Sequence, residues 1–324
     1  MDLGYPTGEQ LVENMRNFLS VNPEQRLKGG FAEAYRLRDV YPNLSSQLER
    51  VSIANIDTFV RDNPSLEHDA KTMIAYVLLQ SELPIYADMA CWYKKTRKDQ
   101  YSSWLLYLFS AITSQCSGVN DVLESLSNLT VITFNYDVSF EAFFLNQFQS
   151  QERYQSSVQT LLDGLDVIHI YGRLYDLKDQ NGYDLKRYAC YQTEAYNRST
   201  AEELEDLNFH YLHKAKEFAK NINVMAENKQ QDAAEQPHIL KARQKLKEAE
   251  AVQVIGFGFD PDNLKLLQDK EIRWGYKKQI TYTNFGSAKN LRARAESFFE
   301  DSLSVNLNEL PSSAYVAAKS DIIW

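Results

Sequence analysis

The sequence predicts an α/β fold in which a Rossmann-like parallel sheet carries helices on both faces and large helical insertions. The first observation is a set of short apolar runs, each long enough for one buried strand. The second is that helical patterns begin after residues 137, 260 and 287, soon after three of these runs end. Strands that alternate with helices are typical of βαβ units and a parallel sheet. The expected strands cover 129–134, 165–171, 250–256 and 278–283, with a fifth candidate at 303–307.

The first expected strand ends in a group of polar residues. Its apolar positions stop at Asn135-Tyr136-Asp137, and phenylalanines at helical spacing follow from Phe140. One explanation is that Asp137 or Ser139 serves as the helix N-cap, because a short side-chain oxygen accepts hydrogen bonds from the free N–H groups of the first turn. That explanation leaves Asn135 unaccounted for. Ligands of open α/β sheets bind beyond the carboxyl ends of the strands, so this polar group is also a candidate site.

The other expected strands also end in residues that suit a ligand site. The second ends at Tyr171-Gly172, and the fourth ends at Asn284. The third runs into Gly256-Phe257-Gly258, whose glycines let the backbone pass close to a ligand. Near the start of the chain, Gly4 to Gly8 form a tight loop ahead of a helix, and the free N–H groups of such a loop suit an anion.

Helices account for most of the remaining chain, which we interpret as one domain over 1–324. A capping-box pattern at Thr7 to Gln10 predicts a helix start. A helical insertion is expected over roughly 20–127, with amphipathic helices such as Ile53 to Val60 and Ala70 to Leu79. A second, mostly helical insertion is expected over roughly 176–247. Its predicted helices run from Ala201 to about Asn228 and onward from His238.

Composition excludes several classes of protein. Among 324 residues, 44 acidic side chains outnumber 35 basic ones, which argues against binding to duplex nucleic acid through a basic surface. Cys91, Cys116 and Cys190 lie far apart, so they form neither a four-thiolate zinc site nor a disulfide framework. The most apolar segment, Trp104 to Ile112, has about half the length that spans a bilayer, and no signal peptide precedes it. We therefore expect a cytoplasmic protein without a membrane partner.

Other candidate sites are weaker. His210 and His213 share a helix face without a third metal ligand nearby, so we predict no metal. The charged stretch that begins at Lys241 is typical of a solvated helix face. Nucleophile elbows, Walker loops and zinc-protease motifs are absent from the sequence.

The residues at the strand ends occur in an order that resembles a known family, the sirtuin-like NAD-binding superfamily, in particular its bacterial branch without a zinc module. Members carry a Gly-Ala-Gly-Ala-Ser loop and Gly-x-Pro, then Thr-x-Asn-Tyr-Asp with a downstream Glu, His-Gly-x-Leu, a Gly-Phe/Tyr-x-Phe turn and a strand that ends in Asn. The matching residues, which span nearly the whole chain, are Gly4-Tyr5-Pro6, Thr133-Phe134-Asn135-Tyr136-Asp137 with Glu141, Gly172-Arg173-Leu174, Gly256-Phe257-Gly258-Phe259 and Asn284.

The resemblance implies that the chain binds NAD at these strand ends. Asn135 and Asp137 would line the nicotinamide-ribose pocket, Gly256 to Phe259 would lie along the ribose and phosphates, and Asn284 would face the adenosine ribose. Cleavage of the nicotinamide–ribose bond passes through an oxocarbenium-like state, which polar side chains orient and stabilise. The implied cofactor-binding residues are Gly4, Tyr5, Pro6, Thr133, Asn135, Asp137, Gly256, Phe257, Gly258, Phe259 and Asn284.

Two departures from the family pattern bear on catalysis. The family's base, a histidine before Gly-x-Leu, is Tyr171 here, and a phenol with a pKa near 10 is a poor base at neutral pH. His169 would lie on the same face of the strand but about 6.5 Å further back, so we interpret it as structural. The second departure is that the Gly-Ala-Gly-Ala-Ser loop and its strand would precede Gly4. We therefore expect a shortened fold whose first strand is apparently missing and which binds NAD weakly or not at all.

Two functions remain open. In the first, the chain hydrolyses NAD and releases nicotinamide, with Asn135 as the main catalytic residue and Tyr171 in the base position. The bacterial resemblance implies a role in antiphage defence beside a protein partner or in a homo-oligomer. It does not favour protein deacetylation, because the zinc module and the histidine are absent. In the second, the chain is a catalytically inactive nucleotide-binding or scaffold protein of the same fold, with NAD or an ADP-ribose-like nucleotide as its ligand.

Overall fold

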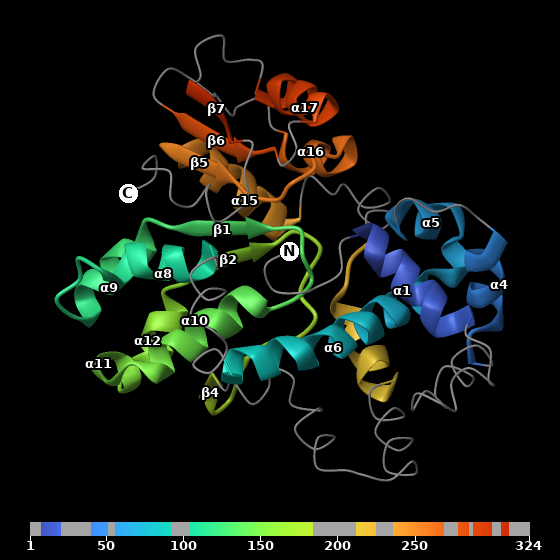
Figure 1. Ribbon diagram of the computed structural model, residues 1–324, viewed down its shortest axis with the longest axis horizontal. Helices are drawn as coiled ribbons and strands as arrows, with labels where there is room; N and C mark the ends of the chain where they lie inside the picture. The colour runs from blue at the N-terminus through green and yellow to red at the C-terminus, as the bar shows by residue number, and fades with distance from the viewer. Residues whose placement is uncertain are drawn as a thin grey trace.

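The computed structural model describes residues 8–20, 40–50, 56–91, 104–183, 212–224, 236–268, 278–284, 288–299 and 306–310. These residues form a mixed α/β structure with many helices and short parallel sheets (Figure 1). The predicted α/β class is confirmed at this level. The described strands divide into a two-stranded parallel sheet, a three-stranded parallel sheet and a separate small antiparallel hairpin.

Four of the five predicted strands are confirmed to within two residues at each end. β1 and β2 pair in parallel with Thr133 opposite His169, and β6 pairs in parallel with β5 on one side and β7 on the other. The fifth strand was expected over 303–307; its described part covers Asn306–Leu310, and residues 303–305 lie outside the described ranges. The parallel strands are β1 (Thr130–Thr133), β2 (Asp166–His169), β5 (Ala251–Val254), β6 (Gln279–Thr283) and β7 (Asn306–Leu310).

Helices begin after β1, β5 and β6 as predicted. α10 (Ser139–Ser150) follows β1, α16 (Pro261–Leu267) follows β5, and α17 (Lys289–Phe299) follows β6. At the start of α16, the Asp260 side chain accepts hydrogen bonds from the backbone N–H groups of Asp262 and Asn263. α10 buries three phenylalanine rings because they recur on one helix face.

α1 (Gly8–Ser20) precedes the first expected insertion, which covers roughly 20–127 and forms a group of helices over its described part. The helices of the insertion are α4 (Pro42–Arg50), α5 (Ile56–Asp62), a short turn at Pro64–Leu66, α6 (Glu67–Cys91), α8 (Trp104–Thr113) and α9 (Val119–Ser127). α1, α4 and α5 lie together on the right of Figure 1, with α6 running toward them. α8 packs against α10, where the Phe109 ring lies 5.3 Å from that of Phe148. None of the described helices is both long and apolar enough to cross a membrane.

The second expected insertion differs from its prediction. The helix predicted from Ala201 to about Asn228 is present over 212–218 and ends in a 3₁₀ turn, Ala219–Asn221. The chain then leaves the helix because the fully buried Ile222 and Val224 enter the core and the Asn223 N–H donates to the Tyr171 carbonyl, 2.8 Å away. Residues 201–211 and 225–228 lie outside the described ranges. The expected loop near 180 contains a hairpin, β3 (Lys178–Asp179) and β4 (Gly182–Tyr183).

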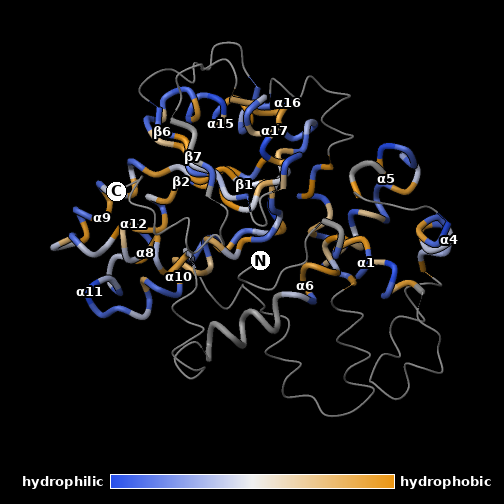
Figure 2. The backbone as a smooth tube through the Cα atoms, turned by 45° about the horizontal axis from the view of Figure 1, so that its top comes forward, coloured by the Kyte–Doolittle hydropathy of each residue, from blue (hydrophilic) through white to orange (hydrophobic). Residues whose placement is uncertain are grey.

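α15 (Pro237–Glu248) packs on β2 in a hydrophobic cluster that also includes α16 (Figure 1). Asp166, at the start of β2, pairs with Lys241 and Lys245 of this helix, and these contacts hold its pKa below the usual range although burial opposes them. Two short helices, α11 (Glu152–Gln155) and α12 (Val158–Asp163), precede β2. Figure 2 shows α11 as a hydrophilic outer turn.

Candidate functional site

The carboxyl ends of four parallel strands meet, as the sequence pattern predicts for a ligand site. Phe134 after β1 stacks on Phe257 after β5, with ring centroids 4.9 Å apart. The Phe134 ring also meets Tyr171, which follows β2, at 5.6 Å. The Gly256 N–H after β5 donates to the Thr283 hydroxyl oxygen at the end of β6, 2.9 Å away. The two parallel sheets are therefore joined at the edge where α/β proteins bind ligands.

Asn135 lies at this edge with an exposed side chain, and hydrogen bonds hold its backbone in place. Its N–H donates to the Thr133 hydroxyl at 3.1 Å. Its carbonyl oxygen lies 2.9 Å from His169 Nδ1 on the neighbouring strand. The backbone on both sides of the Cα atom is therefore fixed, and the amide side chain faces solvent.

His169 connects this backbone to a buried carboxylate. Its Nε2 atom lies 2.9 Å from Glu141 Oε1, in the first turn of α10. Burial acts to lower the pKa of His169, but the hydrogen bond and charge of Glu141 outweigh it, so that the pKa lies above its ordinary value. The other oxygen of Glu141, Oε2, is buried and makes no hydrogen bond within the described residues.

Asp137 is buried beside this pair and turns back toward its own helix. Its Oδ1 atom accepts hydrogen bonds from the Ser139 N–H, at 3.1 Å, and from the Ser139 hydroxyl. Burial raises the pKa of Asp137, and the Ser139 hydrogen bonds only partly oppose this effect. The N-cap position of α10 is Val138 rather than Asp137 or Ser139, although Asp137 satisfies one N–H of the first turn. The proposed nicotinamide-ribose contact of Asp137 stays a prediction.

Tyr171, in the position of the family's base, is buried and 3% exposed. Its hydroxyl donates to Asn263 Oδ1 in the first turn of α16. Its ring packs against Phe134 and Tyr136. The catalytic role of this phenol stays a prediction, and in this structure the hydroxyl joins β2 to α16.

The glycine turn after β5 presents its backbone to open space. Gly256 adopts a positive φ of 64°, and a Cβ atom at Gly256 or Gly258 would meet no atom of the described residues within 4 Å. Phe259 also has a positive φ, 50°, and its side chain packs into the core against Tyr282. The glycine backbone of this turn can therefore approach a ligand, whereas the buried Phe259 side chain cannot.

Asn284 ends β6 but is fully buried. Its Nδ2 atom donates to the Ala288 carbonyl at 3.1 Å and to Glu309 Oε1 at 3.0 Å. Its Oδ1 atom accepts from the Ala288 N–H at 3.0 Å. The amide closes the loop between β6 and α17, and its predicted contact with an adenosine ribose is not tested. Gly4, Tyr5 and Pro6 lie outside the described residues.

Sequence reasoning missed two contacts of this site. The first is the pair His169 and Glu141, for which the signal was a histidine on a buried strand and a carboxylate in the first turn of the helix that follows β1. The second is Asn263, which occupies the first turn of a helix that starts beside the end of β2. Both contacts join segments far apart in the chain, so spacing alone did not indicate them.

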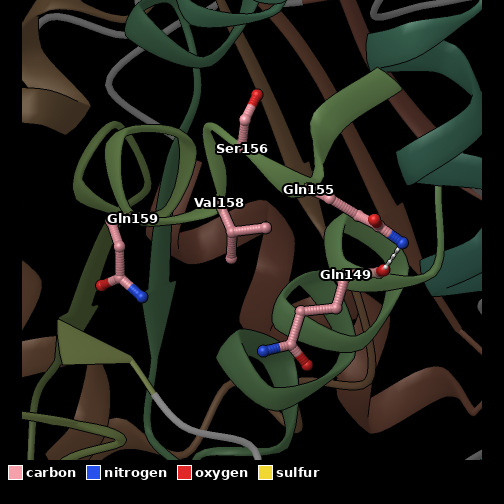
Figure 3. A pocket seen from close by; sticks show the side chains of 5 residues that line it. All are labelled: Gln149, Gln155, Ser156, Val158 and Gln159. Atoms are coloured by element: carbon pink, nitrogen blue, oxygen red, sulfur yellow. Dashed lines mark hydrogen bonds between the residues drawn. The ribbon is translucent and has the colours of Figure 1, made fainter. Parts of the chain in front are cut away.

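A separate hollow of about 340 Å³ lies between α10, α11 and α12, lined by Gln149, Gln155, Ser156, Val158 and Gln159 (Figure 3). The Gln155 side chain bridges it by donating to the Gln149 carbonyl at 3.1 Å. It sits at the carboxyl end of α10, a helix of 12 residues that is about 18 Å long. Asn135 precedes the opposite end. This hollow contains no titratable side chain, and we assign it no chemistry.

In the part of the chain that the structure describes, no group of three or more His, Cys, Asp or Glu side chains could hold a metal ion. Comparisons with protein-family models, with curated proteins and with solved structures found no match to this chain. The contacts at the strand ends are therefore the basis for a functional assignment.

Proposed function

We propose that the chain is a sirtuin-like protein with a Rossmann-like nucleotide site, and that it hydrolyses NAD to release nicotinamide. The observation that supports this proposal is the position of Asn135. It is an exposed amide at the joined carboxyl ends of the parallel strands, and its backbone is held on both sides. An amide so placed can orient the ribose hydroxyls and stabilise the positive charge that develops as the glycosidic bond breaks.

The residues beside Asn135 fit a dinucleotide. The open space at Gly256 and Gly258 leaves room for a phosphate or ribose to approach the backbone. The ring stack of Phe134 and Phe257 joins this turn to the Asn135 tip. In the proposal, the glycine turn binds the nucleotide and Asn135 orients the bond that breaks.

A second candidate function is nucleotide binding without cleavage. The buried Tyr171 favours it, because the residue in the base position already donates its hydroxyl to Asn263 and lies within an aromatic cluster. A tyrosine in this state does not readily accept a proton from a ribose hydroxyl. In this case the chain binds NAD or an ADP-ribose-like nucleotide as a scaffold.

The biological setting follows from the resemblance alone. A bacterial, cytoplasmic role in antiphage defence is part of the proposal, and so is a protein partner or a second copy of the chain. The acidic charge of −9 supports a partner other than duplex nucleic acid.

Calorimetry with NAD and with ADP-ribose, together with a nicotinamide-release assay, tests both candidates. The Asn135→Ala variant is expected to lower nicotinamide release by about a hundredfold and to change the free energy of unfolding by less than about 0.5 kcal/mol. The control is Asn120→Ala, since Asn120 is an exposed asparagine on α9. Nucleotide binding without nicotinamide release would select the second candidate. Unchanged NAD affinity and turnover in Asn135→Ala would remove the site assignment.

A further inference from the structure

The contacts of His169 fix where its protons lie. A backbone carbonyl oxygen accepts hydrogen bonds and cannot donate them, so His169 Nδ1, 2.9 Å from the Asn135 carbonyl, must carry a proton. The Nε2 atom lies 2.9 Å from Glu141 Oε1, and that contact needs one more proton between the two atoms. The side chains of both residues are largely buried, at 6% and 12% exposure. Two protons are therefore associated with the imidazole ring, one on Nδ1 and one between Nε2 and Glu141 Oε1. The net charge of the two side chains together is zero.

We propose that His169 and Glu141 are positioning residues, which hold the Asn135 carbonyl as a proton-sharing pair and thereby aim the Asn135 side chain. This inference rests on the proposed function, because it assigns the pair to the same site. Neither side chain needs to touch the nucleotide. Glu141 orients the imidazole, the imidazole holds the carbonyl, and the Thr133 hydroxyl holds the Asn135 N–H.

The arrangement explains why a solvent-exposed amide can be an oriented group. The Asn135 side chain is exposed, so packing does not fix its direction. Its Cα–Cβ bond is directed by the backbone, which is anchored through the N–H on one side and the carbonyl on the other. Loss of the carbonyl anchor frees the peptide that follows Asn135. A displacement of about 1 Å at a reacting group can lower a rate by about a hundredfold.

The titratable groups around His169 come from three segments: α10, the loop after β1 and β4. Glu141 belongs to α10, and Asp137 belongs to the loop after β1; both favour a proton on His169. Tyr183 of β4 lies beyond Glu141, and burial is the main reason that its pKa is about 12. Because the pKa of His169 is raised, the stabilisation from the pair is complete below the unfolded histidine pKa and is lost as the pH rises through the folded value.

Nitrogen NMR of histidine-labelled full-length chain tests the pair without a ligand. We expect both ring nitrogens of His169 to be protonated at neutral pH, and His169→Gln identifies the signals. In Glu141→Gln, the Nδ1 proton should remain and the Nε2 proton should be lost at a lower pH than in the wild type. An unprotonated Nδ1 in the wild type, or a titration of His169 that Glu141→Gln leaves unchanged, would overturn the inference.

The functional readout compares Glu141→Gln with His238→Gln. His238 is a matched control because it is also an imidazole on a backbone carbonyl: its Nε2 atom lies 3.0 Å from the carbonyl of Ile170, after β2, whereas the carbonyl of Asn135 is held by His169. We expect Glu141→Gln to lower kcat by about tenfold or more, with less change in KM, and to shift the pH profile of kcat. His238→Gln should leave kcat within about twofold. Equal losses in both variants would contradict positioning by the pair.

The two levels of the proposal fail in different ways. A wild-type chain that neither binds nor cleaves NAD overturns the proposed function and with it the catalytic role of the pair. A wild-type chain that cleaves NAD, and a Glu141→Gln variant with unchanged kcat and pH profile, overturn only the positioning role. The NMR measurement decides the proton-sharing contact in either case.

Discussion

The ends of β1 and β2 differ from the ends of β5 and β6 in what they present to solvent. After β1, the Asn135 side chain is exposed, while His169 behind it is buried and hydrogen-bonded. After β5, the glycine backbone is exposed and has no side chain to present. After β6, the Asn284 amide is fully buried and hydrogen-bonded to Ala288 and Glu309. One region presents a functional group, and the other presents a backbone surface.

A polar residue at a strand tip can therefore have either of two roles: its side chain can face solvent, or it can anchor the local fold. Asn135 and Asn284 occupy equivalent places in the sequence pattern, each directly after a parallel strand or one residue beyond it. The Asn135 amide makes no hydrogen bond to the residues that the structure describes, and its backbone is the anchor. Asn284 uses its amide as the anchor. Mutations that separate these roles test the comparison.

The largest expected effect is that of Gly172→Ala, at the end of β2. Gly172 has a φ of 76°, and a Cβ atom there would lie 2.1 Å from the Asn221 carbonyl oxygen. A backbone clash added to left-handed strain should lower the free energy of unfolding by about 3 kcal/mol or more. Gly256 has a similar φ, 64°, but open space around it. Gly256→Ala should therefore cost only about 1 kcal/mol.

Urea unfolding of the two glycine variants measures this difference. The comparison requires Gly172→Ala to be the less stable by about 2 kcal/mol. Equal losses would show that the end of β2 is as open as the end of β5, and the contrast between the two regions would fail.

An intermediate effect is expected for Asn284→Ala. This change removes three hydrogen bonds and leaves the Ala288 N–H and Glu309 Oε1 without their buried partner. The free energy of unfolding should fall by about 1–3 kcal/mol. Asn135→Ala removes an exposed amide and should cost less than about 0.5 kcal/mol. Thermal and urea unfolding of both variants check the order, and a larger loss in Asn135→Ala would reverse the assigned roles.

Sequence reasoning predicted the strands well because buried parallel strands are short apolar runs that depend little on distant residues. β1, β2, β5 and β6 follow that rule. β7 continues beyond the expected end at residue 307, through the polar Asn308 and Glu309, and Glu309 is held in the sheet by hydrogen bonds to Tyr282 and Asn284. The helix predicted to reach Asn228 ends early for a similar reason, because the Tyr171 carbonyl captures the Asn223 N–H.

The sequence predicted where the candidate site lies, but it did not predict the directions in which the side chains of the site point. The convergence of Asn135, Tyr171 and Gly256 at one edge follows from parallel strands, whose carboxyl ends share an edge. The direction of each side chain depends on partners distant in sequence. Tyr171 turns inward because Asn263, 92 residues later, accepts its hydroxyl proton. His169 is held by Glu141, 28 residues earlier. Spacing along the chain does not indicate such partners.

The smallest expected effect on stability, and the sharpest on the site, is that of Gly258→Ala. A Cβ atom at Gly258 meets no atom within 4 Å in the part of the chain that the structure describes, and the φ of this glycine is not positive. The free energy of unfolding should therefore change by less than about 0.5 kcal/mol. The added methyl group would occupy the space through which, in the proposed complex, a ribose or phosphate would approach the backbone. NAD affinity should fall by about tenfold, which corresponds to about 1.4 kcal/mol.

Gly118→Ala is the matched control, because a Cβ atom at Gly118, before α9, also meets nothing within 4 Å among the described residues. Calorimetry should show wild-type NAD affinity in Gly118→Ala, and the same affinity in Gly258→Ala would mean that the backbone surface after β5 is not where the nucleotide binds.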